Sequence, residues 1–393
     1  MVKLNTGSIL TYFLYIPLMI VYHSIKEIKQ ILYALPLFVT MVVLIFYACD
    51  YIFNKRKYPL KLDRGLVTSL GFFLFACISS LIVAPETIYW FTFFRDIIII
   101  AGPIIIFSYD VKYSHSDVVA LLFTALVTYL IWIKFNVDFV FLKSIFESNY
   151  VVDNEYDYGT ITGIFIIYFL YKKDYKMLLV AIVYLLFVNK RATFLGLLPS
   201  ILAYYGGIRF FQLDKNKWAL FSFLFAYYIS FYIISINLPY FTSQFLALTG
   251  KQHIKLDDFL TGRMVMMNPM LPEIYNRGFL NYFFGNGIGQ ADYWLWKTVK
   301  HFIYNFKDKP INPHNDFMKL QFDIGLFGVI VYFFIMYYMY CVSNVGIMIF
   351  LFAVPLFLIE NTLIYYINLI LCCVVARADN YLEDKRKNLL KDL

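Results

Sequence analysis

Residues 66–83 read LVTSLGFFLFACISSLIV and contain no charged side chain. A helix needs roughly 20 mainly apolar residues to cross the hydrocarbon core of a bilayer, so this run approaches the length of a membrane span. Comparable runs recur along nearly the whole chain, for example at 9–21, 37–47 and 221–238. The repetition predicts an integral membrane protein that crosses the bilayer many times.

The apolar runs are typical of helices and not of barrel strands. A membrane barrel strand alternates apolar and polar residues, whereas residues 97–100 (IIII) and 329–339 (VIVYFFIMYYM) are apolar on every side. Lipid offers no partner for backbone amides, so each span must close its own hydrogen bonds, as a helix does. We therefore predict an all-α, polytopic membrane protein.

The composition excludes a soluble globular domain. Of 393 residues, 61% are hydrophobic and 15% are charged, and the mean hydropathy is +0.66, whereas average soluble domains carry about a quarter charged residues. No small-residue cleavage site follows the apolar run after Lys3, so the first span is expected to stay as an anchor. The five cysteines lie in or beside apolar runs without CxxC spacing, which predicts apolar packing and neither disulfides nor metal ligation.

The hydropathy pattern predicts about twelve transmembrane helices in a single membrane domain, 1–393. Basic clusters near 55–64, 172–176, 209–217 and 385–391 then fall on one side, which the positive-inside rule assigns to the cytoplasm together with both termini. The expected spans are 8–22, 31–53, 65–84, 88–108, 117–135, 158–171, 176–189, 192–206, 218–238, 315–341, 345–359 and 361–376.

One large loop, 239–313, falls on the opposite, periplasmic side. Loops much longer than about 15 residues are usually functional or disordered, and the many aromatic residues of this one favour an ordered loop. Residues 257–264 (DDFLTGRM) lead into an expected amphipathic helix that continues through Tyr275, and 283–289 (FFGNGIG) is typical of a glycine-rich turn. We expect a loop that contains helices and docks on the membrane face.

Two arginines stand out as candidate anion ligands. The predicted topology puts Lys190 and Arg191 at the external end of a span, against the positive-inside pattern, and Arg263 in the external loop. Guanidinium groups bind phosphate through paired hydrogen bonds and keep their charge. The alternatives are a snorkelling basic pair at a helix end and an arginine that is solvated or paired with a carboxylate.

His314 lies where the long loop enters the next span. A histidine at this interface is a candidate general base with a pKa near neutrality. The alternative is a helix-capping segment, in which Asn312 or Asn315 caps the helix and Pro313 occupies its first turn. Both interpretations stay open, and either Asp316 or Asp323, which lie on the same predicted helix, is expected to orient a base or pair with an arginine.

Other charged residues favour structural roles. Asp323 lies deep in its span, where an ionised carboxylate needs a partner, and Arg95 with Asp96 forms an expected self-compensating buried pair. The same interpretation covers Arg277, Lys319 and Glu360. The acidic run 153–157 is expected to be a solvated loop, with cation binding as the alternative. The remaining histidines, His23, His115, His253 and His301, have no companion motif, and no metal site is expected.

Five short motifs occur in one order along the chain. They are NKRATFLG (189–196), TGR (261–263), GNGIG (285–289), PHNDF (313–317) and GLFG (325–328). In this order, and with this topology, the chain resembles the O-antigen polymerase and O-antigen ligase superfamily. The motifs cover roughly residues 180–340, and because each is short, the specificity comes from their order.

The resemblance implies a glycosyltransferase that acts at the periplasmic face of the bacterial inner membrane, without metal or other cofactor, on an undecaprenyl-pyrophosphate-linked oligosaccharide. Arg191 and Arg263 would bind the pyrophosphate and neutralise charge on the leaving group, and His314 would accept the proton of the attacking sugar hydroxyl. The further residues expected to contact the substrate are Lys190, Arg277, Asn315 and Asp316.

Three alternatives remain from the sequence. The short, aromatic-rich chain and the modestly basic loop favour a polymerase, which joins lipid-linked repeat units, over a ligase, which transfers the glycan to the lipid A core. A flippase or transporter of lipid-linked glycans would carry several cations in mid-span, where Arg95 is nearly alone. A chain-length regulator is a potential partner. The chain is not expected to be a regulator itself, because a regulator would have few spans and a large coiled-coil domain, and this chain has neither feature. No nucleic-acid partner is expected.

Overall fold

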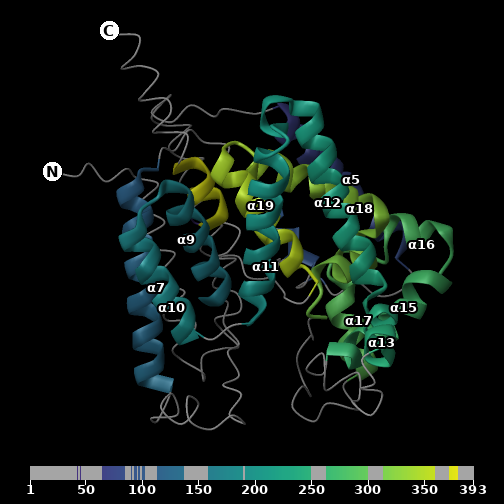
Figure 1. Cartoon of the computed structure of the whole chain (residues 1–393). Coiled ribbons are helices and arrows are strands. Elements are labelled where there is room, and N and C mark those ends of the chain that lie inside the picture. The colour runs from purple at the N-terminus through teal and green to yellow at the C-terminus, as the bar shows by residue number, and fades with distance from the viewer. Residues whose placement is uncertain are drawn as a thin grey trace.

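The computed structural model describes residues 64–84, 113–136, 158–188, 191–248, 263–299, 313–358 and 371–378, with positions 42, 45, 90, 93–94, 96–97 and 100–101. Every regular element in these ranges is a helix, which confirms the predicted all-α class (Figure 1). The helices are α5 (Arg64–Val83), α7 (His115–Asn136), α9 (Tyr158–Lys172), α10 (Tyr175–Val188), α11 (Arg191–Ile201), η3 (Leu202–Arg209), η4 (Leu213–Lys215), α12 (Lys217–Ile236), α13 (Leu238–Leu248), α15 (Arg263–Asn276), α16 (Phe279–Phe284), α17 (Gln290–Val299), α18 (Asp316–Tyr340) and α19 (Asn344–Leu356).

Three of these helices are long and apolar enough to cross a membrane: Gly65–Val83, Lys217–Ile236 and Asp316–Tyr340. Four shorter apolar helices lie at His115–Val127, Gly159–Lys172, Tyr175–Val188 and Asn344–Leu356. All seven lie where the sequence predicts a span. The predicted spans 8–22, 31–53, 88–108 and 361–376 lie wholly or largely outside the described residues, so the total of twelve stays a prediction.

The predicted span 192–206 is not a uniform α-helix. α11 ends at Ile201, and the chain continues as the π-helical η3 through Arg209. Pro199 lies inside α11 just before this change, and a proline both removes one helical N–H donor and pushes against the preceding turn. The wider, π-helical turns of η3 therefore begin just after the point at which the proline interrupts the regular helical hydrogen bonds.

The predicted span 315–341 is broken within α18. Gly325 has φ 66° and ψ −175°, far from helical values, so residues 316–324 and 326–340 form two helical halves. A Cβ at this position would collide with the backbone of Phe283 at the end of α16. The break therefore needs glycine for two reasons, its left-handed φ and the close approach of another backbone segment.

The long helices pack antiparallel. At the start of α5, Gly65 abuts Tyr338 near the end of α18, and further along Phe75 packs against Phe327 with ring centroids 5.8 Å apart. α9 and α19 are paired in the same way, because the Asn344 side chain donates to the Tyr171 hydroxyl at 3.3 Å while Gly163 lies against Phe352. These contacts between antiparallel helices define two ends of the bundle.

The first end, called the basic end below, gathers the described basic clusters. Arg377 donates to the Met339 carbonyl at 3.2 Å at the end of α18, and the Arg209 guanidinium lies 5.9 Å from the ring centroid of Tyr204, which contacts Tyr171 in turn. Lys172 follows Tyr171, and Lys217 begins α12. The described basic clusters thus share one end, as the positive-inside pattern predicts.

The second end, called the His314 end below, joins the starts of α11 and α18 to the ends of α5, α12 and α19. Ser235 in the last turn of α12 donates to Asn315 at 2.7 Å, and the Asp316 N–H donates to the Phe357 carbonyl just after α19 at 2.9 Å. Gly196 of α11 packs against Phe352 of α19, so Arg191 lies toward this end. Figure 1 shows α13, α15 and α17 together at the lower right, beside α12 and α18.

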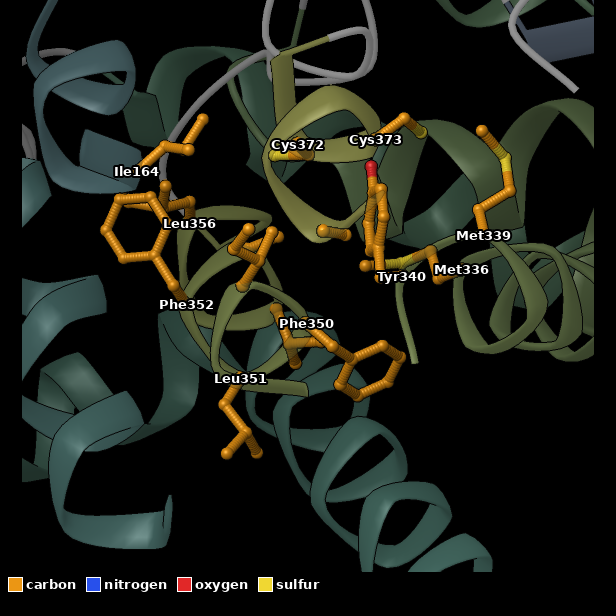
Figure 2. Packing of buried hydrophobic residues seen from close by; sticks show 14 of the residues in the cluster. Ile164, Met336, Met339, Tyr340, Phe350, Leu351, Phe352, Leu356, Cys372 and Cys373 are labelled. Carbon is orange, nitrogen blue, oxygen red and sulfur yellow. The ribbon is translucent and has the colours of Figure 1, made fainter. Parts of the chain in front are cut away.

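The core of the bundle is aromatic and aliphatic. Figure 2 shows Phe350, Leu351 and Phe352 pointing from α19 to different sides, with Phe352 toward Ile164 of α9, and it shows Tyr340 of α18 beside Cys373 of the helical segment 371–378. Cys77, Cys372 and Cys373 are buried free thiols, in line with the predicted packing role, and Cys49 lies outside the described residues.

Candidate functional site

Each residue predicted to be catalytic stands at the beginning of a helix. Arg191 is the first residue of α11, Arg263 is the first residue of α15, and His314 lies two residues before α18 begins at Asp316. The side chains of both arginines, and all of Lys190, lie outside the described residues. A helix start carries backbone N–H groups without helical partners and the positive end of the helix dipole, which favours an anion near Arg191 and Arg263. At the start of α18 the Asn315 side chain and the Phe357 carbonyl already accept from such N–H groups.

The turn at His314 is set by its neighbour. Asn315 is the N-cap of α18, because its side-chain oxygen accepts from the Met318 N–H at 3.0 Å and also from Ser235. This settles the capping residue as Asn315 and not Asn312, and Pro313 precedes the cap instead of occupying the first helical turn. The capping residue and the predicted catalytic residue are therefore different: Asn315 caps the helix, and His314 lies outside it.

His314 itself adopts a left-handed backbone conformation with φ 52° and is partly buried. A non-glycine residue in this region costs free energy and persists where the surrounding contacts require it. The contacts are those of the following residues: the Asn315 cap and the Asp316 N–H bound to Phe357. The chain is therefore bent sharply at His314 by a well-anchored helix start.

The predicted substrate ligands differ in exposure. Asn315 and Asp316 are fully buried at 0% exposure, so they support the His314 turn from inside the bundle. Arg277, which follows α15, forms an ion pair with Glu273 and donates to the Asn286 side chain at 3.3 Å. Its guanidinium also lies 5.9 Å from the centroid of the Phe322 ring, which places Arg277 where the loop meets α18.

The predicted glycine turn forms that junction. The N–H groups of Asn286 and Gly287 donate to the carbonyls of Phe322 at 2.8 Å and Asp323 at 3.0 Å. These carbonyls lose their usual i+4 helical partners because α18 breaks at Gly325. A Cβ at Gly285 would collide with the Asp323 backbone, so glycine is required for this approach as well. The sequence predicts the turn but not its docking into a broken span.

An apolar cluster extends the junction. It joins α15 and α17 to the first half of α18, which confirms that the described part of the 239–313 loop is ordered and helical, including the predicted helix through Tyr275. The buried members are Met267, Met270, Ile274, Ala291, Trp294, Leu295, Met318 and Phe322.

A buried charge cluster lies next to the apolar one. The Lys319 ammonium pairs with Asp96 at 2.8 Å, Asp323 at 2.9 Å and Asp292 at 3.0 Å. All four side chains are at most 6% exposed, and Asp323 also accepts from the Ala291 N–H at 2.7 Å. Ions withdrawn from water in this way require close partners of opposite charge.

Of these four charged residues the sequence predicted a partner by number only for Asp96. Asp323 was expected to need a partner in its span, and it finds Lys319 one helical turn earlier and not an arginine. Asp96 pairs across the bundle with Lys319, whereas the predicted pairing with Arg95 stays a prediction because Arg95 lies outside the described residues. The i,i+4 spacing of Lys319 and Asp323 was the one feature of the local sequence that could indicate an ion pair. Nothing in the local sequence indicated Asp292 as a partner.

Comparison with known proteins adds no relative: no protein-family model, curated protein or solved structure matches this chain.

Proposed function

We propose that the chain is a surface polysaccharide polymerase of the O-antigen type, a membrane glycosyltransferase that joins undecaprenyl-pyrophosphate-linked repeat units. The proposal places it in the bacterial inner membrane with about twelve helices, both termini in the cytoplasm and the His314 end facing the periplasm. The observation that carries the proposal is the placement of Arg191, Arg263 and His314 at three helix starts, with the starts of α11 and α18 at the end of the bundle opposite the basic clusters.

The chemistry requires a base and an anion site together. In the proposed step, His314 takes the proton of an acceptor sugar hydroxyl, whose oxygen forms a bond to the anomeric carbon of the donor. The bond from that carbon to the pyrophosphate oxygen breaks, and the lipid pyrophosphate leaves with the bonding electron pair. Arg191, Arg263 and the adjacent helix N-termini would stabilise the charge that develops on this oxygen.

Complementation of a polymerase-deleted strain from the same source tests the proposal. Surface glycan is profiled on gels for wild type, His314→Ala, Arg263→Ala and Arg191→Ala, each quantified in the membrane. Matched controls come from the basic end: His115→Ala, whose imidazole lies 3.2 Å from Asp174, and Arg209→Ala. We expect a ladder from wild type and both controls, and a single repeat unit from the three site variants.

Other outcomes would contradict the proposal. A ladder unaffected by His314→Ala and Arg263→Ala at normal expression would remove the catalytic assignment. Polymer that is made but stays on undecaprenyl pyrophosphate, with none on the lipid A core, would instead identify a ligase.

One observation favours the transport alternative. Lys319 and Asp323 are buried ionisable groups of a candidate span, paired with Asp96 and Asp292, and such groups mark ion or substrate pathways in many transporters. A flippase would leave repeat units inside the cell when inactivated, so external lectin labelling of the single unit in the His314→Ala strain separates the two functions. Labelled external units support the polymerase.

A further inference from the structure

Lys319 joins three parts of the molecule. Asp96 belongs to the helical positions 93–94 and 96–97 of the bundle, Asp292 lies in the first turn of the loop helix α17, and Asp323 precedes the break in α18. The Lys319 ammonium donates hydrogen bonds to Asp292 at 3.0 Å and to Asp323 at 2.9 Å, and it forms an ion pair with Asp96 at 2.8 Å. The side chain thus connects the loop, the bundle and the broken helix at one buried point.

The backbone of the same residue reaches the His314 turn. The Lys319 N–H donates to the Asn315 carbonyl at 3.0 Å and closes the first turn of α18. Asn315 follows His314 directly and caps the helix. One residue therefore ties the turn that carries His314 to α17, and through the α15–α17 packing to the helix that Arg263 begins.

The charge balance makes this connection specific to lysine. Three carboxylates face one ammonium, so loss of Lys319 alone leaves buried like charges without a cation. Removal of one partner from a buried ion cluster is far more costly than replacement of the whole cluster by neutral groups. The carboxylates would then separate, and the one on α17 can separate by moving the loop.

We propose that Lys319 is a positioning residue, which holds α17 and the docked loop in place against the turn of α18 that carries His314. The expected effect on glycan transfer rests on the proposed function. The position of the loop can be measured independently of that function. Lys319 would then act on the reaction through geometry, since its ammonium is buried among three carboxylates.

A cysteine reporter measures the loop position. Ala291 in α17 is fully buried at 0% exposure, so Ala291→Cys should be protected from a membrane-impermeant maleimide while the loop is docked; the parent protein, labelled in parallel, corrects for its own cysteines. The reporter is combined with Lys319→Met, Asp292→Asn, Asp96→Asn and Lys297→Met. Lys297 is an exposed lysine of α17 and provides the matched charge-loss control.

Lys319→Met and Asp292→Asn should each raise the labelling rate about tenfold and lower the ladder per molecule of membrane protein about tenfold, which corresponds to about 1.4 kcal/mol. Asp96→Asn, which also removes one carboxylate but not the one on α17, should leave labelling unchanged, as should Lys297→Met. If the Lys319→Met protein does not accumulate in the membrane, the labelling rate of Asp292→Asn tests the positioning role instead.

Equal labelling of Asp292→Asn and Asp96→Asn would overturn the positioning role, as would a lost ladder with a fully protected reporter. An intact ladder in His314→Ala, by contrast, would refute the proposed function and leave the labelling result to stand.

Discussion

The two halves of α18 differ in charge and in packing partners. Residues 316–324 contain Asp316, Lys319 and Asp323, all buried, whereas residues 326–340 contain no charged side chain and pack through aromatic rings. The first half packs against the loop helices α15 and α17, and the second packs against α5 and α12. One continuous stretch of sequence thus serves two environments.

The break at Gly325 allows this division. Its non-helical backbone frees the Phe322 and Asp323 carbonyls, and the glycine turn of the loop supplies their hydrogen-bond partners. Irregular backbone at membrane depth is tolerated where protein satisfies it. The first half can therefore carry the proposed site, while the second half provides stability, so variants of the two halves should fail in different ways.

The largest loss of stability is expected in the apolar half. Phe333 is fully buried, and its ring centroid lies 5.0 Å from that of Phe225. Phe333→Ala should destabilise the protein by about 3 kcal/mol, the low end for a core phenylalanine, because in a bilayer packing is lost but little transfer from water. Membrane yield and thermal aggregation temperature should fall, while glycan transfer per surviving molecule stays close to wild type.

Phe123→Ala is the matched control, since Phe123 is 44% exposed on α7. If Phe333→Ala instead lowered glycan transfer per surviving molecule as strongly as the His314→Ala variant does, the proposed division between the halves would be wrong.

An intermediate effect is expected at the boundary. Gly325→Ala places a Cβ against the Phe283 backbone at a φ of 66°, which should cost about 2 kcal/mol and disturb the docked loop. Both yield and activity per molecule should fall. Gly71→Ala in α5, where a Cβ meets nothing within 4 Å, should be neutral or slightly stabilising. Equal behaviour of the two variants would show that the break is not required.

The smallest stability effect, with the clearest effect on activity, is expected at the cap. Asn315→Ala removes the acceptor for the Met318 N–H, which should cost about 1 kcal/mol and loosen the His314 turn. Asn216→Ala removes the equivalent cap of α12 at the basic end, where the side chain accepts from Trp218 and Ala219. The two should lose similar stability, but only Asn315→Ala should shorten the glycan ladder, which Asn315→Asp should restore.

Much of the described architecture was predictable because it depends on local properties. The helix class and the positions of seven apolar helices follow from the run length of apolar residues, and the grouping of basic clusters follows from their spacing between those runs. The glycine turn at 285–289 was predicted from its composition, and Gly285, Gly287 and Gly289 all have positive φ. The candidate residues at 191, 263 and 314 were singled out by their charge and predicted position, and the motif order implied their roles.

The sequence by itself therefore determined an all-helical, apolar chain with charges sorted to two ends, because hydropathy and turn chemistry act over a few residues. Only the tertiary structure decided that α18 breaks at Gly325 and that Lys319 collects Asp96 and Asp292. These partners lie far apart in sequence, and no local pattern reports a contact between them. A buried ion pair is stable only where packing brings the charges together and excludes water, and that condition belongs to the folded chain.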